Sequence, residues 1–286
     1  MDSSLNPRPA DSGALSDADY QALCAFLESA SGIVLGDNKH YLVVSRLGRL
    51  AKEHDFASVG ELVRSLDKGA GMRLRQDVVD AMTTNETMWF RDTYPFELLS
   101  GKLLPEFAKR GAPRLRIWSA ACSSGQESYS ISMTISEFNQ QNPGLLRSSV
   151  EIVGTDISPS MLEIARSACY DDLIIGRGLS EERRQRFFRQ APCGWQLSDE
   201  VRARARFSEL NLMASYALLG RFDIIFCRNV LIYFSAESKR DILERMAQAL
   251  NPGGYLFLGG SESPTGYTEV FEPVNLGRGV VYRPRR

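Results

Sequence analysis

The sequence has few of the side chains from which metal centres are built. Its 286 residues include two histidines, His40 and His54, whose spacing is unlike that of metal ligands, and no CxxC pair. Structural zinc sites usually need closely spaced His and Cys residues. We therefore expect no metal site.

Closely spaced cysteines are also missing. The five cysteines lie far apart, at positions 24, 122, 169, 193 and 227. An odd number of scattered cysteines favours the reduced thiols of a cytosolic protein over a disulfide framework. The sequence therefore predicts free thiols.

Long apolar runs are absent as well, and the polar residues 1–9 lack the apolar core of a signal peptide. We expect a soluble, cytoplasmic protein without membrane insertion. The 34 basic and 35 acidic side chains nearly balance. This balance argues against binding of nucleic acid, because proteins that bind its phosphates usually carry an excess of basic residues. A local basic patch could still exist in a chain whose total charge is balanced.

The first 83 residues predict a tail followed by helices. Residues 1–14 are rich in Pro, Ser and Asp, which predicts a flexible tail. Residues 15–83 show no strand-like alternation, which predicts a helical domain. Its helices are expected at about 17–30 behind the capping box Ser16–Asp19, then behind a cap at Asp37, then behind the capping box Ser58–Glu61, and at about 72–83.

The second of these helices is amphipathic. Its apolar face is expected to hold Val43, Val44, Leu47, Leu50 and Ala51, and its basic residues Arg46, Arg49 and Lys52 are expected to face solvent. Such basic residues could dock an acidic partner or form an ordinary solvated face.

From Arg114 onward, apolar strands alternate with amphipathic helices. The strands are expected at about 115–121, 150–155, 222–227 and 255–259, and the helices from Gln126, from Ser158–Pro159 and over about 236–250. Residues 251–254 should end the last helix, and 270–275 should pair antiparallel with 279–283. This alternation predicts a doubly wound α/β domain over residues 113–286.

More than 30 residues between Cys169 and Arg206 do not fit this repeat. They predict a helix over about 181–188 and a turn at Ser198–Asp199. The alternation of Val201, Ala203 and Ala205 with arginines then predicts a half-exposed strand. We expect an inserted hairpin, a small β-subdomain at about 187–207.

The first predicted strand of this domain ends in a loop of small residues, Ser119–Gly125, followed by Glu127. Small residues let a loop approach a ligand closely, and the Glu127 carboxylate could pair with a ligand ammonium group. The sequence has no phosphate-binding GxGxxG or P-loop pattern, so we do not expect the loop to bind a nucleotide phosphate.

Polar side chains also follow the other strands. Asp156 ends the second strand, where an acid can accept hydrogen bonds from both ribose hydroxyls or cap the next helix. Asn211 with Leu212 follows the strand expected near Arg206, the third along the chain, where an amide can read an adenine edge and a leucine can cover its face, and Asn229 with Val230 follows the fourth, at 222–227. A ligand with ribose, adenine and an amino-acid end but no phosphate is S-adenosylmethionine.

Over nearly its whole length the chain resembles the chemotaxis receptor methyltransferases, which are CheR-type protein-glutamate O-methyltransferases. The motifs that carry the resemblance are Met82–Arg91 (MTTNETMWFR), Ile117–Ser130 (IWSAACSSGQESYS), Gly154–Ser158 (GTDIS), Phe226–Phe234 (FCRNVLIYF) and Gly259–Glu262 (GGSE). The resemblance implies a helical N-terminal domain, a linker at 84–112, a class I methyltransferase sheet and an inserted β-subdomain. It also implies transfer of methyl groups from S-adenosylmethionine to receptor glutamates, with S-adenosylhomocysteine as the product.

The resemblance gives the linker a role as well. In the family, a Thr-Asn-x-Thr-x-x-Phe-Arg segment reaches the cofactor, which here implies Asn85, Thr87 and Arg91. The implied cofactor set is completed by residues at the strand ends: Glu127, Asp156, Asn211, Leu212, Asn229 and Val230. Arg91 and Tyr233 are the candidates for orienting the cofactor or the substrate carboxylate, and a packing role for Tyr233 stays open. The implied partners are the cytoplasmic helical region of methyl-accepting chemoreceptors and regulatory proteins, and we expect a monomer.

Two other functions fit the same fold. Nucleic-acid amino-methyltransferases usually carry an Asn/Asp-Pro-Pro-Tyr-like turn after the fourth strand, whereas this chain has Arg228-Asn229-Val230-Leu231. A non-catalytic protein that binds the cofactor and signals through its helical domain is the other alternative.

Overall fold

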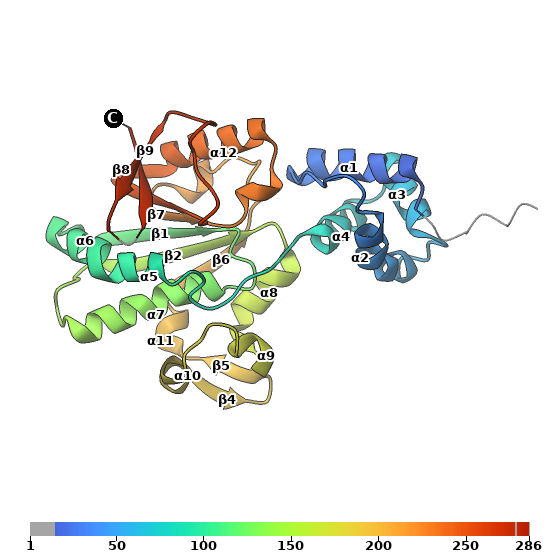
Figure 1. Ribbon diagram of the computed structural model, residues 1–286. Coiled ribbons are helices and arrows are strands. Elements are labelled where there is room, and N and C mark those ends of the chain that lie inside the picture. Colours follow the sequence, from blue (N-terminus) through green and yellow to red (C-terminus); the bar gives the residue numbers. More distant parts are fainter. Residues whose placement is uncertain (1–14, 278, 286) are drawn as a thin grey trace, which may run out of the picture. The chain divides into compact units, whose positions relative to one another are not determined.

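The computed structural model describes residues 15–277 and 279–285, and the chain divides into two compact units, up to Thr84 and from Asn85 onward (Figure 1). The predicted flexible tail, residues 1–14, lies outside the described residues. Within the described residues, no helix is long and apolar enough to cross a bilayer.

The described part of the first unit is helical, as predicted. Its helices are α1 Asp17–Ser31, α2 His40–Glu53, α3 Val59–Asp67 and α4 Met72–Met82. The caps predicted at Ser16 and Ser58 are confirmed, because their hydroxyl oxygens accept hydrogen bonds from the backbone N–H of Asp19 and Glu61 at 3.1 and 3.2 Å. Such caps satisfy donors at the first turn that have no partner inside the helix.

Two predictions for α2 are wrong. The helix begins at His40 with Lys39 rather than Asp37 at the N-cap position. Val44, predicted to be buried, is 38% exposed. Successive residues of a helix point about 100° apart, so the narrow buried stripe that contains Val43 and Leu47 leaves Val44 at its edge.

Arg46 does not point freely into solvent, contrary to the prediction. Its guanidinium donates to the backbone oxygens of Met82 and Thr83 at 2.7 and 2.8 Å and to the hydroxyl of Thr84 at 3.2 Å. The last carbonyls of a helix lack partners inside it, and Arg46 satisfies such groups at the end of α4. The neighbouring basic residues Arg49 and Lys52 are exposed.

The second unit begins with short helical segments inside the stretch predicted as a linker. These are α5 Tyr94–Leu98, the π-helical turn η1 Leu99–Leu103 and α6 Leu104–Arg110. Their buried side chains, among them Phe96, Leu103 and Phe107, join the main core of this unit. This part of the predicted linker is therefore packed against the sheet.

The main sheet of the described residues has the strand order β6-β2-β1-β7-β8-β10-β9. Its strands are β1 Arg114–Ala120, β2 Ser149–Asp156, β6 Ala205–Glu209, β7 Phe222–Cys227, β8 Leu250–Leu258, β9 Phe271–Asn275 and β10 Val280–Pro284. The adjacent strands β6, β2, β1, β7 and β8 pair in parallel, and β10 pairs antiparallel with both β8 and β9. The predicted doubly wound α/β class and the closing antiparallel pair are confirmed.

The connecting helices also match the predictions closely. They are α7 Gln126–Gln141, α8 Pro159–Ser167 and α12 Ala236–Ala249, with 3-10 turns η2 Ala217–Leu219 and η3 Leu231–Tyr233. Helix α12 ends at Ala249, as expected from residues 251–254, but these residues already belong to β8, which starts at Leu250 and not near the predicted position 255. The amide of Asn251 donates to Asp223 at 2.8 Å, and the pairing of β7 with β8 shifts register between Phe222 and Ile224.

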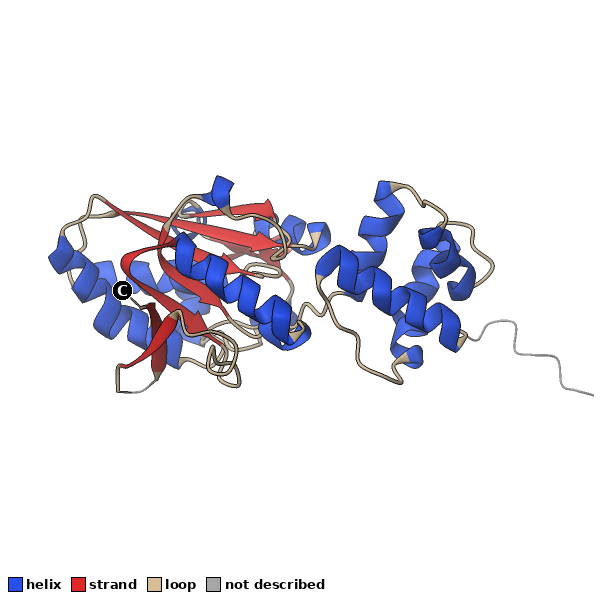
Figure 2. Cartoon of the chain, turned by 90° about the horizontal axis from the view of Figure 1, so that it is seen from above, coloured by secondary structure: helices blue, strands red, loops and turns tan. Residues whose placement is uncertain are grey.

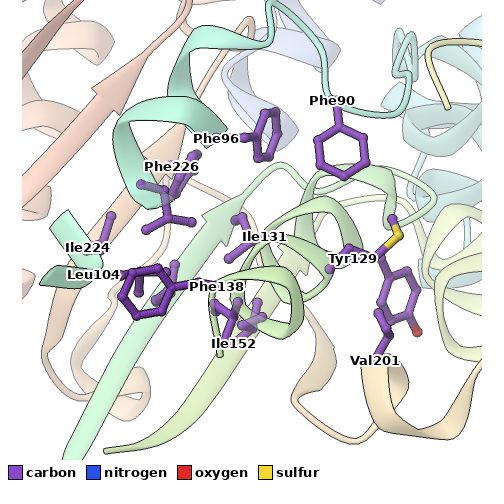
Figure 3. Packing of buried hydrophobic residues seen from close by; sticks show 14 of the residues in the cluster. Phe90, Phe96, Leu104, Tyr129, Ile131, Phe138, Ile152, Val201, Ile224 and Phe226 are labelled. Atoms are coloured by element: carbon purple, nitrogen blue, oxygen red, sulfur yellow. The ribbon is translucent and has the colours of Figure 1, made fainter. Parts of the chain in front are cut away.

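Alternate residues of the central strands face two different cores, with helices on both sides of the sheet (Figure 2). In β7, Ile224 and Phe226 join the cluster of α5, α6 and α7, whereas Ile225 and Cys227 join that of α12. Figure 3 labels members of the first cluster, including Phe96 of α5 beside Phe226. Burial on both faces explains why these strands appear as continuous apolar runs.

A small antiparallel sheet with strand order β3-β5-β4 forms the inserted subdomain. Its strands are β3 Cys169–Tyr170, β4 Phe188–Ala191 and β5 Gly194–Leu197, and the neighbouring helices are α9 Asp172–Ile175, α10 Glu181–Phe187 and α11 Asp199–Arg202. The predicted strand through Val201 is wrong, because Asp199–Arg202 is helical and Ala205–Glu209 pairs with β2 in the main sheet. Packing of α11 on α7, where Ser132 donates to the Val201 carbonyl at 2.8 Å, overrides the local alternation.

The prediction of free thiols is wrong for one pair. Cys169 and Cys193 form a disulfide, with Cα atoms 6.2 Å apart. Cys169 lies on β3, which pairs antiparallel with β5, and Cys193 lies in the turn just before β5, so the small sheet brings together two cysteines that are 24 positions apart in the sequence. Cys24, Cys122 and Cys227 are free cysteines.

Candidate active site

The predicted site residues of the second unit lie at or beside the carboxyl edge of the parallel strands. The loops after β1, β2 and β7 begin at neighbouring positions, because β2, β1 and β7 pair in register at Ala120, Thr155 and Cys227. In open α/β sheets, ligands bind at this edge.

Asp156 joins two of these loops. Its buried carboxylate accepts hydrogen bonds from the backbone N–H of Ser123 at 2.7 Å and of Ser158 at 2.9 Å. Ser158 is the N-cap of α8 and accepts from Met161 N–H at 3.2 Å. The residue that caps α8 is therefore Ser158 and not Asp156, for which a helix-capping role was the alternative.

The loop after β1 is held in a tightly turned conformation. Ala121, Ser123 and Gly125 have φ values of 57°, 48° and 94°. A Cβ atom added to Gly125 would lie 3.0 Å from the Cβ of Ala165, so glycine is needed both for the backbone angle and for close packing on α8.

A buried arginine that was not among the predicted site residues connects three parts of the site. The side chain of Arg228 is 1% exposed and pairs with Glu127 at 2.9 Å and Asp92 at 2.7 Å. It also donates to the carbonyl of Arg91 at 2.8 Å. Its position inside the apolar run Phe226–Phe234 was the signal in the sequence, because an unpaired charge is costly to bury.

Glu127 therefore has partners within the protein. One carboxylate oxygen pairs with Arg228 and the other accepts a hydrogen bond from the hydroxyl of Ser119 at 2.8 Å. The expected pairing with a ligand ammonium group would use a carboxylate already oriented by these contacts.

The segment from Asn85 to Arg91 lies against the same loops. The carbonyl of Asn85 accepts from the Ser123 hydroxyl at 3.0 Å, and the N–H of Phe90 donates to the Ser130 hydroxyl at 3.1 Å. The Arg91 guanidinium donates to the Glu86 carbonyl at 3.0 Å. These contacts bring Asn85 to the loop after β1 and Phe90 to α7, with half-buried Thr87 between them.

The β-subdomain fixes the other side of this segment. The N–H of Trp89 donates to the Arg177 carbonyl at 3.0 Å, and its indole N–H donates to the Ile174 carbonyl at 3.1 Å. The guanidinium of Arg177 pairs with Glu86, and this hydrogen bond lowers the pKa of the Glu86 carboxyl.

Asn211 and Leu212 form the turn after β6. The side-chain oxygen of Asn211 accepts from the N–H of Met213 at 2.9 Å, and Leu212 is buried. Arg245 of α12 donates to the Leu212 carbonyl at 2.8 Å. This contact holds the turn against the face of the sheet that carries α12.

Asn229, Val230 and Tyr233 follow β7. Asn229 has a φ of 58°, and its buried side-chain oxygen meets no hydrogen-bond donor among residues 15–277 and 279–285. The carboxylate of Glu262 accepts from the N–H groups of Asn229 and Val230. Tyr233 is half-buried in η3 and packs on the core that contains α12, which keeps its packing role open.

The two buried thiols near the edge are poor nucleophiles. Burial raises the pKa of Cys122 well above its usual value, and the nearby carboxylates of Asp156 and Glu127 act in the same direction. Burial likewise raises the pKa of Cys227. Both remain protonated at neutral pH, and only a thiolate is an effective nucleophile. Among the described residues, no group of His, Cys, Asp and Glu side chains could hold a metal ion.

These features suit S-adenosylmethionine. The edge carries the strand-end carboxylate of Asp156 and an Asn229 amide oxygen that meets no donor among residues 15–277 and 279–285, and the backbone N–H groups of Asn229 and Val230 already bind a carboxylate. The fold and this edge define a class I S-adenosylmethionine-dependent methyltransferase.

Comparisons with known proteins identify the family. Residues 18–83 match the family described as "CheR methyltransferase, all-alpha domain", and residues 85–280 match "CheR methyltransferase, SAM binding domain". The chain therefore belongs to the CheR methyltransferase family. It is 54% identical over 271 residues to chemotaxis protein methyltransferase 1 of Pseudomonas aeruginosa, covering 94% of this chain and 98% of that protein. It is 56% identical over 270 residues to the chemotaxis protein methyltransferase of Vibrio parahaemolyticus, with the same coverage, and 34% identical over 255 residues to that of Escherichia coli, covering 87% and 86%.

The Arg228 contacts predict a large stability effect. Arg228→Met should lower the free energy of unfolding by about 3–5 kcal/mol, because Glu127 would lose the partner of a mostly buried charge. Exposed Arg240, whose Nε donates to the Tyr267 carbonyl at 2.9 Å, provides the control Arg240→Met. Urea unfolding of both variants measures the difference, and equal losses of stability would contradict the structural role of Arg228.

Proposed function

We propose that this protein transfers methyl groups from S-adenosylmethionine to glutamate side-chain carboxylates of chemoreceptors. The products are glutamate methyl esters and S-adenosylhomocysteine, formed in chemotactic adaptation. One observation carries the proposal for the site: Asp156, Asn229 and the Asn85–Arg91 segment border the same edge of the sheet, beside thiols that are buried and protonated. Family membership supports the chemotactic role.

The reaction needs alignment more than acid–base chemistry. The bound cofactor supplies an electrophilic methyl carbon on a sulfonium. A glutamate carboxylate with a pKa of about 4.3 is already ionised at neutral pH, so no protein group has to remove a proton. The new C–O bond forms as the C–S bond breaks, and the sulfonium charge is neutralised. Orientation of two reactants can supply roughly 7–11 kcal/mol of a barrier.

The predicted residues take the following proposed roles. Asp156 accepts hydrogen bonds from the ribose hydroxyls, Asn211 and Leu212 contact the adenine, and Glu127 contacts the ammonium end. Arg91 and Tyr233 orient the cofactor or the substrate carboxylate. The remaining proposed cofactor contacts are Asn85, Thr87, Asn229 and Val230.

The substrate would be the cytoplasmic helical region of methyl-accepting chemoreceptors, so we propose that the protein acts in the cytoplasm; we also propose that it is a monomer. Exposed Arg49 and Lys52 of α2 are the proposed docking residues, because chemoreceptor glutamates present negative charge. Arg46 is better assigned to holding the end of α4.

Asp156→Ala should weaken binding of S-adenosylhomocysteine by about tenfold or more, because hydrogen bonds from two hydroxyls to a charged group are lost. Asp223→Ala is the matched control. Asp223 accepts the backbone N–H of Arg116 at 2.8 Å and lies on β7 away from its carboxyl end, so its loss should reduce stability without changing affinity. Calorimetry measures both affinities, and equal values for the two variants would assign Asp156 a structural role alone.

The chemical nature of the product distinguishes glutamate methylation from the two alternative functions. Label transferred from methyl-labelled cofactor to receptor membranes should be released as methanol in mild base, because carboxyl esters hydrolyse there and methylated amines do not. Base-stable label would rule out esterification of glutamate, and binding of cofactor without transfer would favour a non-catalytic protein.

Charge reversal at both Arg49 and Lys52 should slow receptor methylation and weaken its dependence on salt, while leaving cofactor affinity unchanged. Exposed Lys68 and Arg73, which lie outside α2, provide a control double reversal with the same change in charge. Initial rates at several ionic strengths test the idea. Equal behaviour of the two double variants would remove α2 as the docking helix.

A further inference from the structure

Glu262, from the last motif of the sequence, binds backbone groups after two neighbouring strands. Its Oε2 accepts from the N–H of Asn229 and of Gly259, both at 2.7 Å, and its Oε1 accepts from the N–H of Val230 at 3.0 Å. β7 and β8 pair in parallel up to Cys227 and Leu258, so the carboxylate bridges the loops that follow them.

These contacts account for the unusual backbone of Asn229. Its φ of 58° is left-handed, a conformation that is costly for residues other than glycine and is best tolerated by Asn and Asp. Successive N–H groups beside a left-handed residue form a concavity that binds anions. Glu262 fills this concavity, which keeps the Asn229 backbone in place and leaves no room there for a ligand phosphate.

The absence of a side chain at Gly259 leaves room for the Glu262 carboxylate. A Cβ atom on Gly259 would lie 2.6 Å from Glu262 Oε2, 2.8 Å from Asn229 Nδ2 and 2.9 Å from the Asn229 backbone nitrogen. Gly260 differs, because an added Cβ would meet no described atom within 4 Å. The close approach of the loops after β7 and β8 therefore depends on glycine at position 259.

The amide side chain of Asn229, whose backbone Glu262 holds, still needs a hydrogen-bond donor for its oxygen. The buried Oδ1 of Asn229 lacks a donor among residues 15–277 and 279–285, and an unpaired buried acceptor is costly. We infer that Glu262 is a positioning residue for the cofactor: it fixes the Asn229 backbone so that the Asn229 amide oxygen can accept a hydrogen bond from S-adenosylmethionine. This inference rests on the proposed cofactor site and adds a residue that does not itself touch the ligand.

The primary test measures binding of S-adenosylhomocysteine by calorimetry, together with the midpoint of thermal unfolding without ligand. Glu262→Gln should weaken binding by about tenfold, because an amide cannot accept all the N–H groups that converge on the carboxylate. Gly259→Ala should weaken binding to a similar extent by displacing the same carboxylate. Gly260→Ala is the control for Gly259→Ala, and Glu269→Gln, at a side chain that is 87% exposed, is the control for Glu262→Gln. Both controls should bind normally.

A double-mutant cycle separates positioning from general support of the fold. If Glu262 acts through Asn229, adding Glu262→Gln to Asn229→Ala should weaken binding by less than about twofold more. A full additional tenfold loss in that background would overturn the inference, as would normal affinity of both Glu262→Gln and Gly259→Ala. Should Glu262→Gln fail to fold, Gly259→Ala alone and combined with Asn229→Ala provides the same test. Absence of binding by the unaltered protein would instead refute the proposed cofactor site.

Discussion

The site depends on charged side chains that hold the backbone of loops after parallel strands. Each such loop leaves the sheet with N–H and C=O groups that have lost their ladder partners, and buried backbone groups need new ones. The carboxylate of Asp156 accepts hydrogen bonds from the backbone N–H groups of Ser123 and Ser158. Glu262 accepts hydrogen bonds from those of Asn229 and Val230. Arg228 donates a hydrogen bond to the carbonyl of Arg91. Hydrogen bonds to charged groups are stronger than neutral ones, so they can fix loops with left-handed residues.

This arrangement suits a reaction that needs positioning and no proton transfer. The ionised groups at the edge are largely paired with one another or with backbone, as for Arg228 with Glu127 and Asp92. A general base near neutral pH would need a different setting, with a titrating group exposed to the substrate. A preorganised edge instead favours displacement at a methyl carbon, in which alignment of the reacting groups lowers the barrier.

The elements whose signals are local were predicted well from the sequence. Ser16 and Ser58 cap the helices they were expected to cap, and β7 has the predicted bounds Phe222–Cys227. Errors occurred where distant contacts decide the outcome. Val201 lies in a helix because α11 packs on α7, and Arg46 turns toward the end of α4 because carbonyls there lack partners. The Cys169–Cys193 bond depends on the pairing of β3 with β5, which cysteine spacing alone does not reveal.

The sequence by itself determined the doubly wound fold, the family and the residues offered at the strand ends, because periodicity, caps and long motifs are encoded locally. The tertiary structure decided how those residues are held. Arg228 and Glu262 stand in motifs that the sequence displays, yet their partners Asp92, Glu127 and Asn229 lie 136, 101 and 33 positions away along the chain. Such pairings follow only from the order of strands in the sheet, because that order determines which loops become neighbours.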